Sequence, residues 1–312
     1  MKSITKTAIN IFPGKSIILK WGALCPVLLR NYLSYRFFHA IARRVPKTIN
    51  LLTNMGISHS CLYKIPSNYN HVAIFGKPEY YLGERGALKL SECLTQYSDA
   101  FVDIGAHIGY FTFYVREKMA LDKPIFFFEP DPNLFNLIDK NVNLNELKNV
   151  HGFQAAISSK SGSIKFYKNL SDSSSGSITQ DFYSKHEVQE ITVQSTTFSN
   201  FLNKYSLNNV CVKVDVEGAE SDFIKGAMTS LNDISYLIVE VLGPAINNNF
   251  IQNMIELGYF AYYINDYCLE HSIDGSFNYV APQYNWLFCH DHPSQLSEKL
   301  EKTKFKIKSN SK

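Results

Sequence analysis

One stretch decides the fold of this chain: Phe101-Val-Asp103-Ile-Gly105-Ala106-His107-Ile-Gly109-Tyr-Phe-Thr112. The apolar run 100–104 predicts a short strand, and the run 110–119 predicts a helix. The glycines between them allow a sharp turn and a close approach of backbone to a ligand. In open α/β sheets, nucleotide-like ligands bind at such turns, beyond the carboxyl ends of the strands. The stretch therefore predicts a cofactor site.

The glycine spacing in this stretch excludes the usual dinucleotide pattern. Dinucleotide sites read Gly-x-Gly-x-x-Gly, because the middle glycine lets the pyrophosphate approach backbone amides. Here His107 takes that place, and its side chain would crowd a pyrophosphate. S-adenosylmethionine has no phosphate, and its sulfonium and amine are cations that favour a carboxylate such as Asp103. We therefore expect S-adenosylmethionine and disfavour a nicotinamide oxidoreductase. A tight turn without a ligand is the alternative.

A second carboxylate supports this expectation. Glu129 ends the predicted strand 124–128 and follows Gly109 at the distance from which an acidic side chain accepts hydrogen bonds from both ribose hydroxyls. Asp131 and Pro132 then predict a helix start, with a capping side chain and a proline at the first helical position.

Strand and helix patterns alternate through the rest of the chain. Further strands are predicted at 150–157, 163–167, 210–216, 236–241, 259–264 and 286–289, and helices at 134–142, 223–231 and 250–257. This alternation predicts a Rossmann-like α/β fold with a mostly parallel, doubly wound sheet.

The chain from about residue 79 to 289 resembles the FkbM family of methyltransferases. The resemblance rests on the stretches 102–112, 128–132 (Phe-Glu-Pro-Asp-Pro), 155–158 (Ala-Ala-Ile-Ser), 212–220 (Val-Lys-Val-Asp-Val-Glu-Gly-Ala-Glu), 238–241 (Ile-Val-Glu-Val) and 285–288 (Asn-Trp-Leu-Phe). It implies a seven-stranded sheet with the last strand antiparallel, and methyl transfer most often to a hydroxyl oxygen. It also implies that the 155–156 region lies against the adenine. The expected cofactor-binding residues are Asp103, Gly105, Ala106, Gly109, Glu129 and Ala156.

The segment Lys213-Val-Asp215-Val-Glu217 carries the expected chemistry. With a side-chain period of two, its three charges would share one face of a strand. Unpaired buried charge is costly, so an ion pair, a ligand or a metal must offset it. We expect Asp215 to orient the acceptor hydroxyl or act as base, with Lys213 and Glu217 as further catalytic residues. The alternative is a structural Lys213–Asp215 ion pair.

Metal dependence stays open at this point. Glu217, Glu220 and Glu240 would supply carboxylate ligands if a divalent ion is present. Alternatively, Glu220 caps the next helix. His107 contacts the donor, relays a proton or is a turn residue packed by its neighbours.

Charge divides the chain into parts. The net charge is +3, yet residues 1–78 contain eleven Lys and Arg and no Asp or Glu, which leaves 20 basic and 28 acidic residues in the rest. We therefore predict a basic, aromatic-rich, partly helical extension over 1–78, with a helix around 28–37. The methyltransferase domain then spans 79–292, and a lysine-rich tail, frayed or surface-bound from Lys299, spans 293–312.

Composition narrows the partners and the location. No run approaches the roughly 18–20 apolar residues that cross a bilayer, and no secretory leader is recognisable. The expectation is a cytoplasmic protein with peripheral membrane contact through 1–78 and a small-molecule or glycan acceptor. Nucleic acid ranks below glycans, because the predicted domain is acidic. The competing interpretation is a catalytically silent binding module on a membrane or polyanionic glycan. The oligomeric state stays open.

Overall fold

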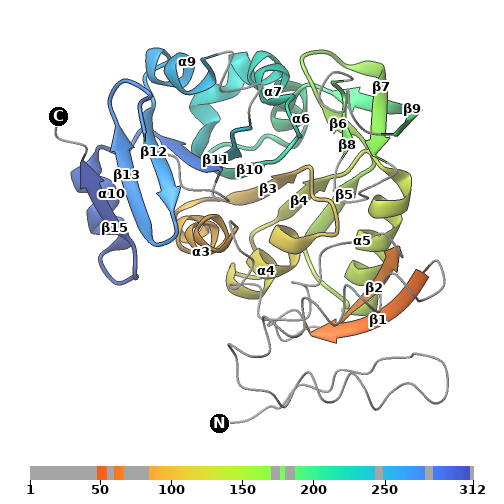
Figure 1. The fold of residues 1–312 in the computed structure, drawn as a ribbon. Coiled ribbons are helices and arrows are strands. Elements are labelled where there is room, and N and C mark those ends of the chain that lie inside the picture. The colour runs from red at the N-terminus through yellow and green to blue at the C-terminus, as the bar shows by residue number, and fades with distance from the viewer. Residues whose placement is uncertain are drawn as a thin grey trace, which may run out of the picture.

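The structure is a computed structural model that describes residues 48–54, 60–66, 84–169, 176–179, 187–242, 249–277 and 284–309. The helix predicted around 28–37 lies outside these residues. Within the predicted extension, β1 (Thr48–Asn54) and β2 (Ser60–Pro66) form an antiparallel hairpin. In the rest, helices lie on both faces of a large mixed sheet (Figure 1). The predicted α/β class is confirmed.

The large sheet has nine strands, where the family resemblance implied seven. Their order is β15-β13-β12-β14-β11-β10-β3-β4-β5. Five strands run parallel to one another, namely β5, β4, β3, β10 and β11. β14 is antiparallel to both of its neighbours, β11 and β12, and the resemblance implied one such antiparallel strand. The two additional strands are β13 and β15. The bounds are β3 Ala100–Ile104, β4 Ile125–Phe128, β5 Val150–Phe153, β10 Val210–Val214, β11 Ile234–Glu240, β12 Phe260–Asn265, β13 Cys268–Ser272, β14 Asn285–Cys289 and β15 Lys306–Ser309.

Alternation along the strands gives the sheet a separate apolar core on each face. Phe101 of β3 packs on one side and Val102 on the other, as a period of two requires. The first core contains side chains of α3 (Arg85–Leu94), α4 (Tyr110–Lys118), α5 (Pro132–Leu144) and α10 (Pro293–Leu300). The second contains side chains of α6 (Phe198–Tyr205), α7 (Glu220–Ala227) and α9 (Phe250–Glu256). Two short 3-10 turns, η3 (Thr95–Tyr97) and η5 (Met228–Asp233), follow α3 and α7.

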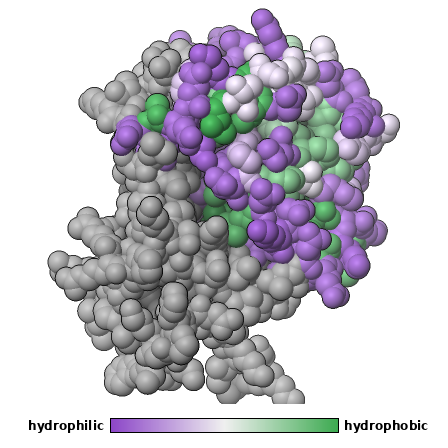
Figure 2. All heavy atoms as spheres, turned by 90° about the vertical axis from the view of Figure 1, so that its right-hand side faces the viewer, coloured by the Kyte–Doolittle hydropathy of each residue, from purple (hydrophilic) through white to green (hydrophobic). Residues whose placement is uncertain are grey.

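A small second sheet lies beside the main one. It contains β6 (Ala156–Ile157), β7 (Gly162–Asn169), β8 (Gly176–Ser177) and β9 (Val188–Thr196), in the order β6-β9-β7-β8. Figure 2 shows that hydrophilic side chains dominate this side of the molecule. Polar contacts that join the small sheet to the rest include those of Lys168 Nζ, which lies 2.8 Å from Asp131 Oδ2, and of Ser177 Oγ, which donates to the carbonyl of Glu217 at 2.7 Å.

Several local predictions are confirmed. Asp131 caps α5 by accepting from the Asn133 amide at 2.8 Å, and Pro132 takes the first helical position. Gly258 follows α9 with a φ of +90°. Several bounds differ from the prediction. β10 ends at Val214 and not at Val216, the predicted strand 150–157 is divided into β5 and β6, and the helix predicted to reach residue 231 ends at Ala227.

The expectation of a tail that is frayed from Lys299 was wrong as far as residue 309. Residues 293–309 contain α10 and β15, and β15 pairs in parallel with β13. The lysines misled the prediction because apolar side chains between them are buried, Leu296, Leu300 and Phe305 among them. Lys299 also pairs with Asp291 at 2.7 Å. In the described part of the chain, no helix has the length and apolar character to cross a membrane.

Candidate active site

Polar side chains line up along one edge of the sheet, where the parallel strands end. Asp103 of β3, Lys213 of β10 and Glu240 of β11 come from neighbouring strands, and Asn285 begins β14 opposite Glu240. By strand alternation, all four lie on the face covered by α3 and α4. This row places the predicted cofactor turn and the predicted catalytic strand side by side.

The turn after β3 needs its glycines for two different reasons. Gly105 has a φ of +77° and Gly109 a φ of +82°, in the left-handed region that costs other residues energy. Gly105 is also crowded, because a Cβ there would lie 1.7 Å from the carbonyl oxygen of Asp215. His107 adopts a left-handed conformation too, with a φ of +55°.

Backbone amides of this turn are engaged within the protein. The amides of Gly105 and Ala106 both donate to the Phe128 carbonyl at 3.0 Å. The amide of His107 donates to Glu129 Oε2 at 2.7 Å. These amides therefore do not form a phosphate cradle, which agrees with the exclusion of a dinucleotide. The turn fits a ligand recognised by carboxylates.

Glu129 is a buried carboxylate held by two amides. Its exposed fraction is 4%, and its oxygens accept from the amides of His107 and Asp131, the latter at 2.8 Å. Burial raises the pKa of Glu129 to about 8, against the lowering effect of these hydrogen bonds, and the charge of Asp103 adds to the rise. Each carboxylate oxygen has lone pairs for more than one donor. The group can therefore still accept bonds from a ribose diol.

Asp103 has a structural task that the sequence did not reveal. Its Oδ2 accepts from the amide of Thr112 at 3.0 Å and from the Thr112 hydroxyl at 2.6 Å, which ties the end of β3 to the first turn of α4. Burial raises the pKa of Asp103 to about 6. Asp103 therefore shapes the turn as well as adding negative charge to it.

Ala156 lies in β6 and not in the main sheet. It pairs with Ser195 of β9, and its side chain is buried with Phe166 and Val193. The side chain thus belongs to the core of the small sheet, and the expected contact with adenine stays a prediction.

Lys213 is a buried lysine among carboxylates. It is 1% exposed, and its Nζ lies 3.7 Å from Asp215 Oδ2 and 3.3 Å from the Val214 carbonyl oxygen. Burial disfavours its charge, but Asp215, Glu84, Glu240 and Asp103 outweigh this and hold the pKa of Lys213 above its ordinary value. The geometry of the alternative, a Lys213–Asp215 ion pair, is therefore present.

The prediction that Lys213, Asp215 and Glu217 share one strand face was wrong. The strand ends at Val214, and Glu217 lies in the following loop with a φ of +51°, which breaks the period of two. Glu220 is fully buried at the start of α7, and its Oε1 accepts from the Gly218 amide at 3.0 Å. Its pKa is raised to about 7 by burial. The N-cap residue of α7 is Ala219, with no capping hydrogen bond from a side chain, so the helix-capping alternative for Glu220 was wrong.

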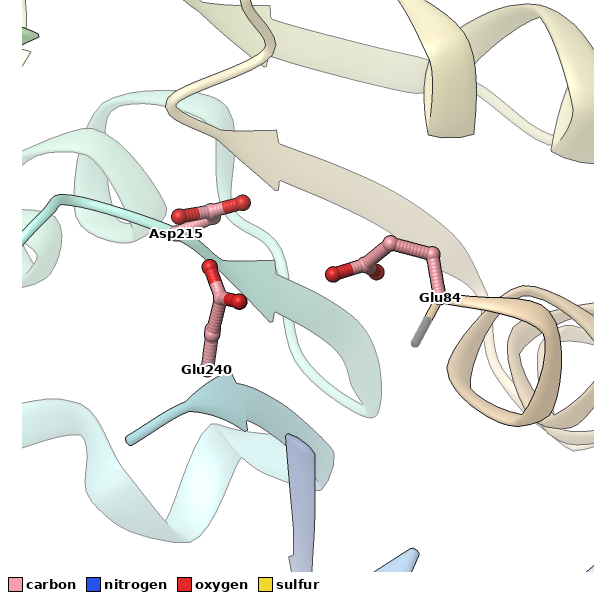
Figure 3. Close-up of side chains that lie close together, drawn as sticks. All are labelled: Glu84, Asp215 and Glu240. Atoms are coloured by element: carbon pink, nitrogen blue, oxygen red, sulfur yellow. The ribbon is translucent and has the colours of Figure 1, made fainter. Parts of the chain in front are cut away.

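A triad of carboxylates forms at the end of this row. Glu84, Asp215 and Glu240 each place a carboxylate oxygen within 4.8 Å of the others, and Figure 3 shows the three side chains directed toward one another. Burial raises the pKa of Glu84 and, together with the charge of Asp215, that of Glu240. Asn285 Nδ2 donates to Glu84 Oε1 at 3.1 Å. Such a cluster can hold hydroxyl groups, take up a proton or bind a cation.

This triad differs from the ligand set expected for a divalent ion. Of Glu217, Glu220 and Glu240, only Glu240 takes part, and Glu84 was missed. Glu84 immediately precedes α3 and is separated from Asp215 by more than a hundred residues. Neither a motif nor a period in the sequence connects it to the strand that it approaches.

Comparisons with known proteins agree with this geometry. The family model described as "Methyltransferase FkbM domain" matches residues 103–270, more than half of the chain. "Methyltransferase 1" of Beauveria bassiana (strain ARSEF 2860) is 31% identical over 146 residues, which cover 41% of this chain and 58% of that protein. "Methyltransferase sdnD" of Sordaria araneosa is 30% identical over 154 residues, which cover 40% of this chain and 59% of that protein. The matches thus span less than two thirds of these relatives.

Solved structures that match this chain include further methyltransferases. One is the precorrin-6y C5,15-methyltransferase of Geobacter metallireducens, with a TM-score of 0.39, 15% identity, and coverage of 67% of this chain and 88% of that chain. Another is the O-methyltransferase of Bacillus cereus in complex with SAH, with a TM-score of 0.38, 9% identity, and coverage of 64% and 79%.

The family match begins at Asp103 and extends through the carboxylates Glu129, Asp215 and Glu240. It thus includes both the turn that the sequence assigned to S-adenosylmethionine and the strand ends beside it. The chain belongs to the FkbM methyltransferase family.

Proposed function

We propose that this enzyme methylates a hydroxyl oxygen of a sugar, a glycan or a related secondary metabolite. The observation that carries the proposal is the carboxylate triad Glu84, Asp215 and Glu240, which lies at the strand ends next to the cofactor turn. An alcohol needs a group that orients it and accepts its proton, and closely spaced carboxylates suit both tasks.

The cofactor is held in this proposal by Asp103, Gly105, Ala106, Gly109, Glu129 and the 155–156 backbone. Glu129 accepts hydrogen bonds from the ribose hydroxyls through its buried carboxylate. When bound, S-adenosylmethionine supplies an electrophilic methyl group on a cationic sulfur. The negative charge of Asp103, and that of Glu129 when it is ionised, favours a cation at this position.

The acceptor is oriented and deprotonated, in this proposal, by residues at the ends of β10 and β11. Asp215 orients the acceptor hydroxyl and accepts its proton. An ordinary aspartate is a weak base for an alcohol, so a neighbouring group has to assist. Lys213 lies 3.7 Å from Asp215 and helps to position that carboxylate, while Glu217 belongs to the adjoining loop.

An acceptor screen tests this function. Purified enzyme and S-adenosylmethionine labelled in the methyl group are incubated with monosaccharides, oligosaccharides, phenols, amines and carboxylic acids. We expect label in hydroxyl-bearing sugars or metabolites, at positions that mass spectrometry assigns to oxygen. Label confined to amines or carboxylic acids would refute methylation of a hydroxyl group while leaving the family unchanged.

We further propose that residues 1–78 bring the enzyme to an anionic membrane surface on the cytoplasmic side. The support is the charge of this segment, with eleven basic and no acidic residues. Flotation with liposomes of anionic and neutral lipids measures the binding. Charge reversal in the full-length chain (Arg43→Glu, Arg44→Glu and Lys47→Glu together) should weaken it on anionic liposomes. Equal flotation of variant and wild type would contradict the membrane role.

A further inference from the structure

The carboxylate triad has the composition of a cation site. We propose that Glu84, Asp215 and Glu240 bind a divalent metal ion such as Mg²⁺ or Mn²⁺, with Asn285 at the edge of the site. This inference goes beyond the proposed function, because metal binding does not depend on the identity of the methyl acceptor.

The geometry of the three oxygens suits one shared ion. All three ligand atoms lie within 4.8 Å of one another. Oxygens on opposite sides of one ion lie about 4.2 Å apart for Mg²⁺ and about 5 Å apart for Ca²⁺. The side chains come from three separate elements, the start of α3 and the ends of β10 and β11, and they converge (Figure 3). A set made only of oxygens suits hard cations such as Mg²⁺, Ca²⁺ and Mn²⁺.

Asn285 gives an independent indication of a ligand. It is 1% exposed, and its Nδ2 contacts Glu84 Oε1 at 3.1 Å, so its amide end meets the triad. Its Oδ1 has no hydrogen-bond partner in the described part of the chain, and the buried Oε2 of Glu84 also has none there. Buried oxygens are normally satisfied by a donor. Two unsatisfied acceptors at one place therefore indicate a cation that these oxygens would face.

The net charge around the triad also favours a bound cation. Asp103, Glu84, Asp215 and Glu240 surround Lys213, so the ionised cluster has four negative charges and one positive charge. A divalent ion would reduce the net charge of −3 to −1. Bound S-adenosylmethionine would place its positive charge at the turn after β3. Glu240 ends β11, which is two strands away from β3 in the sheet, so the charge of the cofactor lies apart from this carboxylate. The competing arrangement is a triad neutralised by Lys213 and shared protons.

Each of the three residues of the triad is partly exposed, although Oε2 of Glu84 is buried. An ion held between them could therefore keep water among its other ligands. The hydroxyl group of the acceptor would replace one of these water molecules. The cation would then assist the proton transfer to Asp215 that the proposed function requires.

Titration with Mn²⁺ tests the site directly. Free Mn²⁺ is measured by electron paramagnetic resonance in full-length enzyme without cofactor or acceptor. We expect one bound ion per chain with a Kd below about 1 mM, and displacement by excess Mg²⁺. Glu240→Gln should weaken binding about tenfold or more, whereas Glu190→Gln, which removes an exposed carboxylate on β9, should not change it. Circular dichroism confirms that each variant is folded.

A second pair of variants tests the role of Asn285. Asn285→Asp adds a carboxylate and should keep or tighten Mn²⁺ binding, and Asn285→Leu should weaken it. The proposal is overturned if the wild type binds no Mn²⁺ up to about 1 mM, or if Glu240→Gln and Glu190→Gln bind it equally. Because methyl transfer is not measured, a wrong acceptor class leaves this result unaffected.

Discussion

Gly105 and Asp215 touch backbone to backbone. A Cβ on Gly105 would lie 1.7 Å from the carbonyl oxygen of Asp215, and the Asp215 amide donates to the carbonyl of Ile104 at 2.9 Å. The loops after β3 and β10 therefore meet with no space for a side chain between them. The position of the candidate base relative to the cofactor turn is set by the main chain.

Gly105→Ala should destabilise the enzyme strongly. The new methyl group would collide with the Asp215 backbone, and the φ of +77° adds a conformational cost, so the free energy of unfolding should fall by about 2–5 kcal/mol. Gly258→Ala is a matched control, because its φ is +90° but nothing lies within 4 Å of the added Cβ. It should cost only about 1–2 kcal/mol. Urea denaturation measures both, and equal losses would contradict the close contact.

Ionisation of Glu129 should make cofactor binding depend on pH. The pKa of Glu129 is raised to about 8, so the group is mostly protonated at pH 7, and an ionised carboxylate accepts hydroxyl donors better. Affinity for S-adenosylmethionine should therefore increase between pH 6.5 and pH 9, with proton release on binding. Calorimetry in buffers of different ionisation enthalpy measures both effects. The Glu129→Gln variant should bind S-adenosylmethionine more weakly than the wild type at the upper end of this pH range, and its affinity should not depend on pH in this way.

The same carboxyl group links pH to stability without the cofactor. The pKa of Glu129 is higher in the folded enzyme than its ordinary value of 4.5, so the folded state holds this proton more tightly. Its contribution is complete below pH 4.5 and is lost as the pH rises to about 8. Denaturant titrations of wild type and Glu129→Gln across this range should show a smaller decline in the variant. Parallel curves would contradict the raised pKa.

Asp215→Asn separates a catalytic from a structural role. Because Asp215 is about one-third exposed, we expect little change in stability. If Asp215 accepts the proton of the acceptor, kcat should fall by about 100-fold or more while the Kd for S-adenosylmethionine is unchanged. The measurement uses the acceptor found in the screen. A variant that keeps its turnover but loses stability would favour the structural ion pair with Lys213.

Lys213→Met should destabilise the fold in a way that depends on its carboxylate neighbours. Removing the buried ammonium leaves close carboxylates unpaired, which typically costs about 3–5 kcal/mol. Adding Glu240→Gln should recover part of this loss, because one of those carboxylates is then neutral. A double-mutant cycle by chemical denaturation gives the coupling between the two positions. Strictly additive effects would show that Lys213 and Glu240 do not interact.

The sequence predicted the parts of this site that are local in the chain. The turn from Asp103 to Gly109 and the carboxylate after β4 follow from short-range spacing, and both lie where the motif indicates. The end of β10 was misjudged because charge alternation continued two residues beyond the strand, where Glu217 takes a left-handed conformation. Glu84 could not be predicted, since only tertiary packing of α3 brings it to Asp215.

The C-terminal region was misjudged for a related reason. Its lysines obscured a helix and an edge strand that are held by Leu296, Leu300 and Phe305. A count of charges describes the exposed face of such elements and not the buried one. The lysine-rich composition therefore predicted a frayed tail, whereas buried apolar side chains hold these residues in a helix and a strand.

The two apolar cores on either side of the sheet share backbone but few side chains. Every member of the polar row, from Asp103 to Asn285, points to the α3–α4 side. Repacking of Phe198, Phe223 or Phe250 on the opposite side would therefore tune the robustness of the enzyme with little direct effect on its chemistry. The layer under α6, α7 and α9 is the part of this protein that an engineer could rebuild first.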